Sequence, residues 1–524
     1  MAGPSPIFSP RAGSPSQAPT PRVSAGSQGG LVIRNQRGKV DPLDIAMVMA
    51  RRELLARYDA AGNQAELRNH WKAADALSAD AALTPGVRDI LRRRSRYETA
   101  NSPQLKGIAD QVAQDMVGTG PRPHVVVEAG RELEARVVRD AWVAWSRSVN
   151  LTEKLRIMRR ARVDSGEAFA VMVNNDPADR PVQLDLTLYE ADQCAFPPGA
   201  AYGTTDVDGI RYDDFGNPVA YSFLESHPGA ISLKGLSARE EAARNVLHYY
   251  RADRPGQSRG MPDITPALPL FAIMRRFTLA TTLAAETAAN FAGVLRTNAS
   301  SVTRDDDGNE IEQPGLIDME EVELARNAFT ALPAGADLVQ FKAEHPNSTH
   351  KEFQREMLRQ AARCMQMPLI LAGLDSSESN FSAARLDCLT YWRYQRGERC
   401  HMVATVLDPL FRAWWREAIL VDGLLPQRFR LRSTPMPRVE WRWDKVEDIN
   451  PESAANATET ELSNHVTTRR EVFAERGLDW MEEVDQIAFE KKYMAEKGVT
   501  EEDLAAQTAR QQAKPKNGAA APAA

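Results

Sequence analysis

The sequence predicts an α+β protein, and three patterns along the chain carry that expectation. Long stretches repeat apolar residues at steps of three and four, which is typical of helices with one buried face. Two short apolar segments, 168–173 and 182–189, predict strands. The segment from Gly209 to Tyr221 alternates apolar and polar residues around an Asp-Phe-Gly-Asn-Pro turn, and it predicts a β-hairpin.

Length and charge limit the class of protein. A chain of 524 residues exceeds the size at which one core stops growing, so we expect roughly two to four packed units. Its 65 Lys and Arg against 71 Asp and Glu give a net charge of −6, which argues against a protein that grips DNA through a strongly basic surface. Hydrophobic residues make up 43% of the chain, which is ordinary for a soluble body.

Both ends of the chain are predicted to be disordered. Residues 1–30 are dense in Pro and Ser, and 510–524 show no periodicity, so neither can bury enough apolar surface to offset the entropy of ordering. The opening residues contain no apolar run, and we expect no signal peptide.

The first helical pattern covers 41–96. The turn formed by Thr84, Pro85 and Gly86 predicts a helix stop within it. Near its end lies a basic cluster made of Arg92, Arg93, Arg94 and Arg96. Such a cluster can bind nucleic acid or can be solvated or face another subunit. We expect an interface, because no aromatic residues are interleaved with the arginines.

Three more helices, at 106–117, 131–150 and 151–163, precede the first strand. After the hairpin a long helix is expected from Thr265 to Leu295, rich in Ala and Thr on one side, which would let a neighbouring helix approach closely. Three charged residues divide it into uncharged runs of about nine residues, too short for a membrane span.

A second long helix begins at Thr349, which forms a capping box with Glu352, and stops at Pro368. An insert of loops, strands and a short helix (318–331) separates it from the first. Four basic residues recur along one side of the second helix and form what we call the basic stripe: Lys351, Arg355, Arg359 and Arg363.

A polar loop, LAGLDSSESNFSAAR (371–385), leads into a helical pattern that runs to about Leu420, in which Pro409 predicts a kink. Six aromatic residues of this helix could stack on bases, but at helical spacing we expect them in the core. They are Tyr391, Trp392, Tyr394, Phe411, Trp414 and Trp415.

The sequence shows no catalytic, cofactor or metal site. It contains no phosphate-binding loop, nucleophile elbow or H-E-x-x-H motif. The four cysteines lack paired zinc spacing, and the acidic turns at 213–214 and 305–307 lack the ligand pattern of a calcium loop.

Several segments, in order, resemble the lambda-type family of phage portal proteins: RSRYETANSPQLKGIADQVAQDMVGTGPRP (94–123), DGIRYDDFGNPVAYSFLESHPG (208–229), VLHYYRADRPGQSRGMPDITPAL (246–268), NFSAAR (380–385) and RREVFAERGLD (469–479). Their order and spacing over residues 40–500 make the resemblance specific. It implies a subunit with wing, stem, clip and crown regions that assembles into a ring, usually of twelve copies.

The resemblance divides the chain into nine parts: a disordered tail (1–30), the wing (31–264), stem helix 1 (265–298), the clip (299–345), stem helix 2 (346–371), the tunnel loop (372–383), a long kinked helix with a return to the wing (384–449), the crown (450–509) and a second disordered tail (510–524).

The resemblance also implies a role in the virion. The ring would sit at one capsid vertex after assembly in the bacterial cytoplasm, and it would meet the terminase large subunit, the major capsid and scaffold proteins and a head-tail adaptor. It implies no enzyme activity, cofactor, metal or membrane. Double-stranded DNA would pass without sequence specificity, touched by the tunnel-loop residues Ser376, Ser377, Ser379 and Asn380.

Two questions stay open at this point. The basic stripe could line the channel or pair with carboxylates of a neighbouring stem helix, and we expect the second, because a strongly basic lumen would hold DNA. The function could instead be that of another virion structural protein or head-tail adaptor. A metal-dependent DNA-processing enzyme built on the acidic turns is a further alternative.

Overall fold

A computed structural model describes residues 22–25, 31–34, 74–128, 130–176, 180–197, 199, 203, 206–231, 237–290, 294–297, 302–304, 307, 310–312, 336–339, 350–377, 380–431, 434–444 and 451–499. The chain divides into two units, 1–77 and 78–524. In the first, β1 (Arg22–Ala25) pairs antiparallel with β2 (Leu31–Arg34), so 22–25 depart from the expected disorder of 1–30. The β-branched residues of both strands flank a Gly-rich segment, a pattern that favours a hairpin.

Helices open the second unit: α2 (Ala79–Ala82), α3 (Pro85–Asn101), α4 (Pro103–Val117), α5 (Glu132–Ser148) and α6 (Leu151–Ser165). The predicted stop at the Thr84 turn is confirmed, because α2 ends at Ala82 just before it. A new helix starts directly after the turn, where the Thr84 hydroxyl accepts a hydrogen bond from the Val87 amide and caps α3. Ser102 caps α4 in the same way through the Leu105 amide. Proline follows each cap at the first helical position, where its missing N–H costs nothing.

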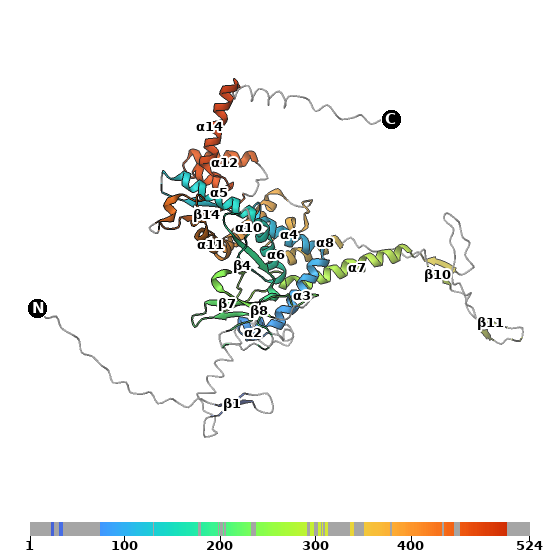
Figure 1. The fold of residues 1–524 in the computed structure, drawn as a ribbon. Helices are drawn as coiled ribbons and strands as arrows, with labels where there is room; N and C mark the ends of the chain where they lie inside the picture. Colours follow the sequence, from blue (N-terminus) through green and yellow to red (C-terminus); the bar gives the residue numbers. More distant parts are fainter. Residues whose placement is uncertain are drawn as a thin grey trace, which may run out of the picture. The chain divides into compact units, whose positions relative to one another are not determined.

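Three small sheets complete the body (Figure 1). The first has the order β5 (Leu184–Tyr189), β4 (Glu167–Asn174), β9 (Val246–Tyr250), and the second has the order β6 (Ile210–Tyr212), β7 (Pro218–Leu224), β8 (Ala238–Ala242). In the third, β3 (Arg122–Val126) pairs with β14 (Arg438–Arg442) from far along the chain. The predicted strands, the hairpin and the α+β class are confirmed, since all pairings in these sheets are antiparallel.

The predicted core role of the aromatic residues is confirmed for four of the six. Tyr391, Phe411, Trp414 and Trp415 are buried, whereas Trp392 and Tyr394 are half-buried. The largest apolar cluster joins Phe411 and Trp414 to Trp142 of α5, with ring centroids 5.2 and 5.3 Å apart.

Helix α7 (Leu268–Asn290) projects from the body and packs against α8 (His350–Ala362) (Figure 1). Phe277 of α7 lies against Phe353 of α8, with ring centroids 4.9 Å apart. The first long helix ends earlier than we predicted, because residues 294–297 form β10 (Val294–Thr297) instead of helix. This segment is rich in β-branched residues, and it pairs with β13 (Ala336–Val339).

Within the insert, β11 (Val302–Arg304) pairs with β12 (Glu310–Glu312), and the predicted short helix at 318–331 lies outside the described residues. Short helical turns occur elsewhere: η2 (Ala191–Gln193), η3 (Ala243–Asn245), η4 (Thr265–Ala267), η5 (Arg363–Met365) and η7 (Gln427–Arg430).

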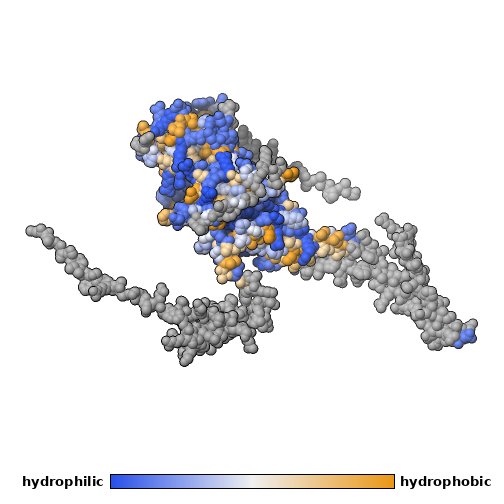
Figure 2. Space-filling view, turned by 60° about the horizontal axis from the view of Figure 1, so that its bottom comes forward, coloured by the Kyte–Doolittle hydropathy of each residue, from blue (hydrophilic) through white to orange (hydrophobic). Residues whose placement is uncertain are grey.

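Residues Thr265–Glu286 are long and apolar enough to cross a membrane, although only 22% of the apolar window is buried within the protein. Figure 2 shows pale and orange side chains over this projecting helix. One face of the helix belongs to the folded body, where Arg275 forms an ion pair with Glu98 of α3 at 2.9 Å. Length and composition alone are weak evidence for a span, and the absence of a membrane segment stays a prediction.

After α9 (Leu369–Gly373), α10 (Phe381–Met402) runs into a π-helical turn, η6 (Val403–Leu407), and then α11 (Asp408–Ala418). Pro409 was predicted to kink this helix, and the structure shows a change of helical type just before it. Proline donates no hydrogen bond to the carbonyl four residues earlier, and the π turn accommodates this loss immediately ahead of it.

The C-terminal helices are α12 (Pro451–Ser463), α13 (Arg469–Glu475) and α14 (Trp480–Lys497). None of their described residues is buried. A capping box between Thr468 and Glu471 fixes the start of α13, and Asp479 caps α14 through the Met481 amide. The last part of the predicted crown, 500–509, lies outside the described residues.

Candidate functional site

The predicted tunnel loop is shorter than expected, because α9 extends to Gly373 and α10 begins at Phe381. Ser376, Ser377 and Asn380 are exposed, and Ser379 lies outside the described residues. Asn380 does more than we predicted, since its side chain accepts a hydrogen bond from the Ser382 amide at 3.0 Å and caps α10.

The basic stripe, three residues of α8 and Arg363 at the start of η5, is mostly exposed. Lys351, Arg359 and Arg363 are exposed, whereas Arg355 is half-buried. Arg359 donates two hydrogen bonds of 2.8 Å to Glu356 on its own helix. Those bonds from Arg359 hold the pKa of Glu356 at about 2.

Asp375 joins the stripe to the loop, a connection that we did not predict. Its carboxylate accepts hydrogen bonds from the Ser377 hydroxyl at 2.6 Å and from the Ser377 amide at 3.0 Å, and it lies 3.6 Å from the Arg355 guanidinium. The Ser377 hydroxyl lowers the pKa of Asp375 first, and Arg355 and Lys351 add to the effect. The Asp-Ser-Ser sequence, typical of side chains that bond their own turn, was the available signal.

The arginine cluster on α3 does not form one interface, which corrects our expectation for Arg92. Arg92 is 5% exposed, and its guanidinium donates to Glu167 of β4 at 2.6 Å. Arg96 lies 2.5 Å from Asp192. Only Arg93 and Arg94 are exposed. Helical periodicity explains the division, because residues 92 and 96 lie on the face that packs against the body.

Glu167 is the centre of a buried charge network. It is fully buried, and it accepts hydrogen bonds from Arg259 at 2.7 Å and from the Gly260 amide at 2.9 Å, while His248 lies 2.9 Å away. Burial alone would raise the pKa of Glu167, but Arg259, His248 and Arg92 outweigh it and hold the pKa well below its usual range. The carboxylate therefore stays charged and ties α3, β4 and β9 together.

A second buried network fixes the long helix α10 to the body. Asp263 lies 3.0 Å from Arg159 and 3.3 Å from Arg162, both on α6. Arg162 also lies 2.5 Å from Glu398 of α10. Burial raises the pKa of Glu398, but the hydrogen bond from Arg162 and the charges of Arg162 and Arg159 dominate, so the pKa falls to about 2.

Sequence reasoning missed both networks because their members lie far apart in the chain. The segment 246–268 could have indicated these networks, since it contains Arg259, Gly260 and Asp263 within five residues. Gly260 is required because a Cβ there would collide with the Gly166 backbone.

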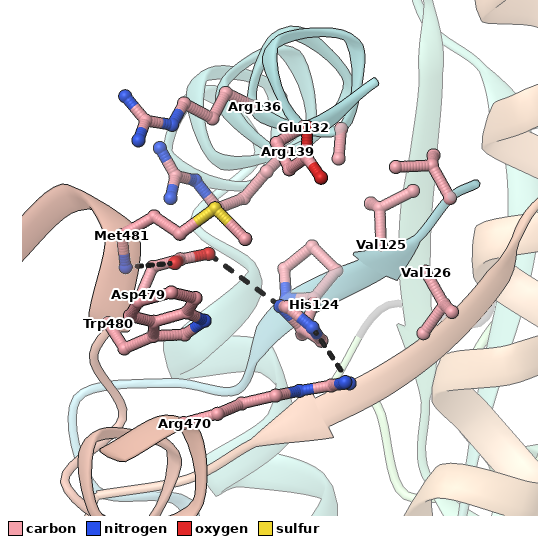
Figure 3. Close-up of a pocket in the computed structure, with 13 residues that line it drawn as sticks. His124, Val125, Val126, Glu132, Arg136, Arg139, Arg470, Asp479, Trp480 and Met481 are labelled. Carbon is pink, nitrogen blue, oxygen red and sulfur yellow. Dashed lines mark hydrogen bonds and ion pairs between the residues drawn. The ribbon is translucent and has the colours of Figure 1, made fainter. Parts of the chain in front are cut away.

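A small cavity of about 270 Å³ lies between β3, α5 and the start of α14 (Figure 3). His124 of β3 lies 3.7 Å from Asp479 and 3.3 Å from Arg470, and these contacts are drawn as dashed lines in Figure 3. The contact with His124 is the main reason that the pKa of Asp479 falls to about 2. Two arginines of α5, Arg136 and Arg139, pair with Asp485 and Glu482 of α14. Charge contacts thus attach α14 to the body.

One group of potential metal ligands occurs among the described residues: Glu190, Asp192 and His227, with ligand atoms within 4.8 Å of one another. Arg96 lies 3.2 Å from Glu190 and 2.5 Å from Asp192, so an arginine already pairs with both carboxylates. We therefore interpret the group as an ion-pair cluster.

The acidic turn that we weighed as a nuclease site is explained locally. Asp213 accepts hydrogen bonds from the amides of Phe215 and Asn217 and closes the β6–β7 turn. In the second acidic turn, 305–307, only Asp307 is described.

A family model and a relative of known name both match most of the chain. The family model described as phage portal protein, lambda family, matches residues 65–399. The chain is 22% identical over 468 residues to the Probable portal protein of Halomonas phage phiHAP-1, a match that covers 84% of this chain and 87% of that protein.

Among solved structures, the neck of an empty GTA particle computed with C6 symmetry matches with a TM-score of 0.40 and 16% identity, covering 75% of this chain and 93% of that chain. A chain of the virion of a native gene transfer agent particle matches with a TM-score of 0.40 and 15% identity, covering 79% of this chain and 99% of that chain. These two likenesses are too low to support an argument about this chain.

Proposed function

The chain belongs to the lambda family of phage portal proteins, and we propose that its copies form the ring-shaped channel at one capsid vertex through which the genome is packaged and ejected. The family match over residues 65–399 is the observation that carries this proposal, because it spans α3 to α10 and includes both buried networks. The protein is thus a structural component of the phage virion.

The order of the elements supports an assignment of each to one region of the subunit. We assign α7 and α8 to the stem, the insert 299–345 to the clip, the loop between α9 and α10 to the tunnel loop, and α12 to α14 to the crown. The contact of Arg355 with Asp375 would then fix the loop to the stem.

DNA passage is supported by the chemistry of the loop and by the distribution of charge. Ser376 and Ser377 are small and exposed, so they can touch a phosphate backbone without reading bases. The insert 299–345 contains eleven acidic and three basic residues, a net charge of −8 that exceeds the −6 of the whole chain. An acidic clip would repel phosphates and favour sliding over binding.

The proposed partners are those of a portal ring: further copies of itself, usually twelve in all, the terminase large subunit, the major capsid and scaffold proteins, and a head-tail adaptor. We propose no cofactor, metal or catalytic activity.

Imaging of the purified protein by negative-stain electron microscopy tests the function. We expect ring-shaped particles with a central hole. A preparation that stays monomeric at micromolar concentration, or that forms only irregular aggregates, would contradict the proposal.

The basic stripe gives a second expected result. We propose that it packs against carboxylates of a neighbouring stem. Arg355→Glu with Arg359→Glu should therefore yield monomers or broken rings. The reversed charges would repel those carboxylates at a packed contact, which costs several kcal/mol. Size-exclusion chromatography with light scattering measures the oligomer. The control is Arg412→Glu with Arg416→Glu, which reverses two exposed charges at the same spacing on α11.

The alternative position of the stripe predicts a different outcome. If the stripe lines the channel, the double variant keeps intact rings and changes the rate of DNA packaging. That result would contradict the interface assignment and leave the portal function standing.

A further inference from the structure

A groove of about 1180 Å³ lies between α10, β14 and α13, and we call it the α10 groove. The side chains that α10 contributes recur at three- and four-residue steps and so form one face of the helix. They are Arg385, Cys388, Leu389, Trp392, Arg396 and Arg399. The floor is formed by Trp441 and Trp443.

The floor of the α10 groove is rigid. The Trp441 indole donates a hydrogen bond of 2.8 Å to Asp408. Arg399 donates to the backbone carbonyls of Asp115 and Met116 at 3.0 Å and lies 5.2 Å from the centre of the Trp443 ring. The groove is therefore shaped before anything binds to it.

The rim of the α10 groove exposes apolar side chains and arginines that have no acidic partner among the described residues. Leu389 is 55% exposed, and Trp392 is half-buried. Arg385 and Arg396 are exposed and form no ion pair within the described part of the chain. An occupant should therefore carry negative charge at its ends and small side chains between them.

Helix α12 has this chemistry. Its only charged residues are Glu452, Glu459 and Glu461, and none of these forms an ion pair with the residues that the structure describes. Glu452 and Glu459 are seven residues apart and share one face with the small residues Ala455 and Asn456, all exposed. Small side chains let a second helix approach closely.

The spacing of the charges is compatible. Two helical turns separate Glu452 from Glu459 by roughly 10 Å, and Arg385 lies roughly 16 Å from Arg396 along α10. The difference of roughly 6 Å is within the combined reach of two arginine side chains, each with a flexible stem of three methylenes.

Within one chain, no described ion pair joins α12 to the α10 groove, although only residues 464–468 separate α12 from α13, which lines it. We infer that the α10 groove of one copy receives α12 of the neighbouring copy, with Glu452 and Glu459 facing Arg385 and Arg396. Such a head-to-tail contact uses two different surfaces of each copy, as a closed ring requires. The inference rests on the proposed function and names the contact that builds the ring.

A nucleic-acid backbone is the competing occupant, because arginines beside a tryptophan also suit phosphates and bases. Glu440, Glu471 and Glu475 on the opposite wall would repel phosphates and the glutamates of α12 alike, so this wall does not separate the two occupants. The assembly and duplex DNA measurements described below decide between them.

Charge reversal on each surface tests the contact. The groove variant carries Arg385→Glu with Arg396→Glu, and the helix variant carries Glu452→Arg with Glu459→Arg. Each should raise the protein concentration at which half of the chains form rings by about tenfold or more, because like charges then face each other. Mass photometry across a dilution series at fixed salt measures this concentration.

Two combinations should restore the rings. A chain with all four substitutions again has opposite charges at each contact, and its half-assembly concentration should return to within about threefold of the wild type. An equimolar mixture of the groove variant and the helix variant should also assemble, with the two chains alternating. The mixture succeeds only if the contact joins different copies.

Arg393→Glu is the matched control, because Arg393 is an exposed arginine three residues from Arg396 that does not line the α10 groove. It should leave assembly unchanged. If a charge reversal prevents folding, Arg385→Gln with Arg396→Gln keeps the size of the side chains while removing charge, and it should still weaken the rings.

Rings that resist both reversals would overturn the inference while confirming the proposed ring. Loss of assembly in both variants without rescue by either combination would also overturn it. Intact rings that retain less of a short duplex DNA after the groove reversal would assign the groove to phosphates instead. If the wild-type chain forms no rings, the proposed function and this inference fail together.

Discussion

Glu167→Gln should lower the free energy of unfolding by about 3 to 5 kcal/mol, the usual cost of leaving buried charges without their partner. Glu167 is fully buried and accepts hydrogen bonds from Arg92 at 2.6 Å and from Arg259 at 2.7 Å. The amide keeps the volume of the side chain but carries no charge. Two buried guanidinium groups would then face an amide that also places an N–H donor among donors.

Urea unfolding followed by tryptophan fluorescence measures this loss, since the core contains several buried tryptophans. Asp89→Asn is the control, because Asp89 forms an exposed pair with Arg93 and should change the free energy by less than about 1 kcal/mol. A loss for Glu167→Gln as small as that of the control would contradict the importance of the network.

The buried pair of Glu398 with Arg162 predicts a dependence of stability on pH. The pKa of Glu398 in the folded protein is about 2, below the ordinary value of 4.5. A depressed pKa stabilises the folded state fully above pH 4.5, and this contribution is lost as the pH falls toward 2. It amounts to roughly 3 kcal/mol at neutral pH.

Glu398→Gln should therefore be less stable than the wild type at pH 7, and the difference should shrink between pH 4.5 and 2. Thermal unfolding across this range measures it. Glu356→Gln is the control, because the pKa of Glu356 is also about 2 but its side chain is exposed on α8. A constant difference between Glu398→Gln and wild type at every pH would show that the pair does not act through charge.

Local signals in the sequence predicted the elements well. The turn at Thr84 marked the helix stop that the structure shows after α2, and Pro409 marked the place near which the helical ladder changes, because caps and prolines act within a few residues. The first long helix was predicted to continue through Leu295, where pairing with β13 prevails over helical periodicity. Strand pairing with a segment about forty residues away cannot be predicted from the local sequence of the helix end.

Charge patterns were harder to interpret than caps. Arg92 and Arg93 are neighbours with the same chemistry, yet one is buried against Glu167 and the other is exposed. The sequence shows that a residue is basic, but its partner depends on tertiary contacts such as the meeting of α3 and β4. The basic stripe on α8 was identified from spacing alone, whereas its link to Asp375 required the three-dimensional arrangement.

The attachment of the C-terminal helices has a consequence for how the protein opens. Helices α12 to α14 bury no described residue, and α14 is attached to the body through ion pairs such as that of Arg136 with Asp485. A segment that exposes little new apolar surface when it detaches needs little free energy to do so, whereas the tryptophan-rich core opens only with global unfolding. Amide hydrogens of α12 to α14 would then exchange with solvent through local fluctuations long before those of α5 and α11. In a subunit outside a ring, this region would therefore be the first part to open.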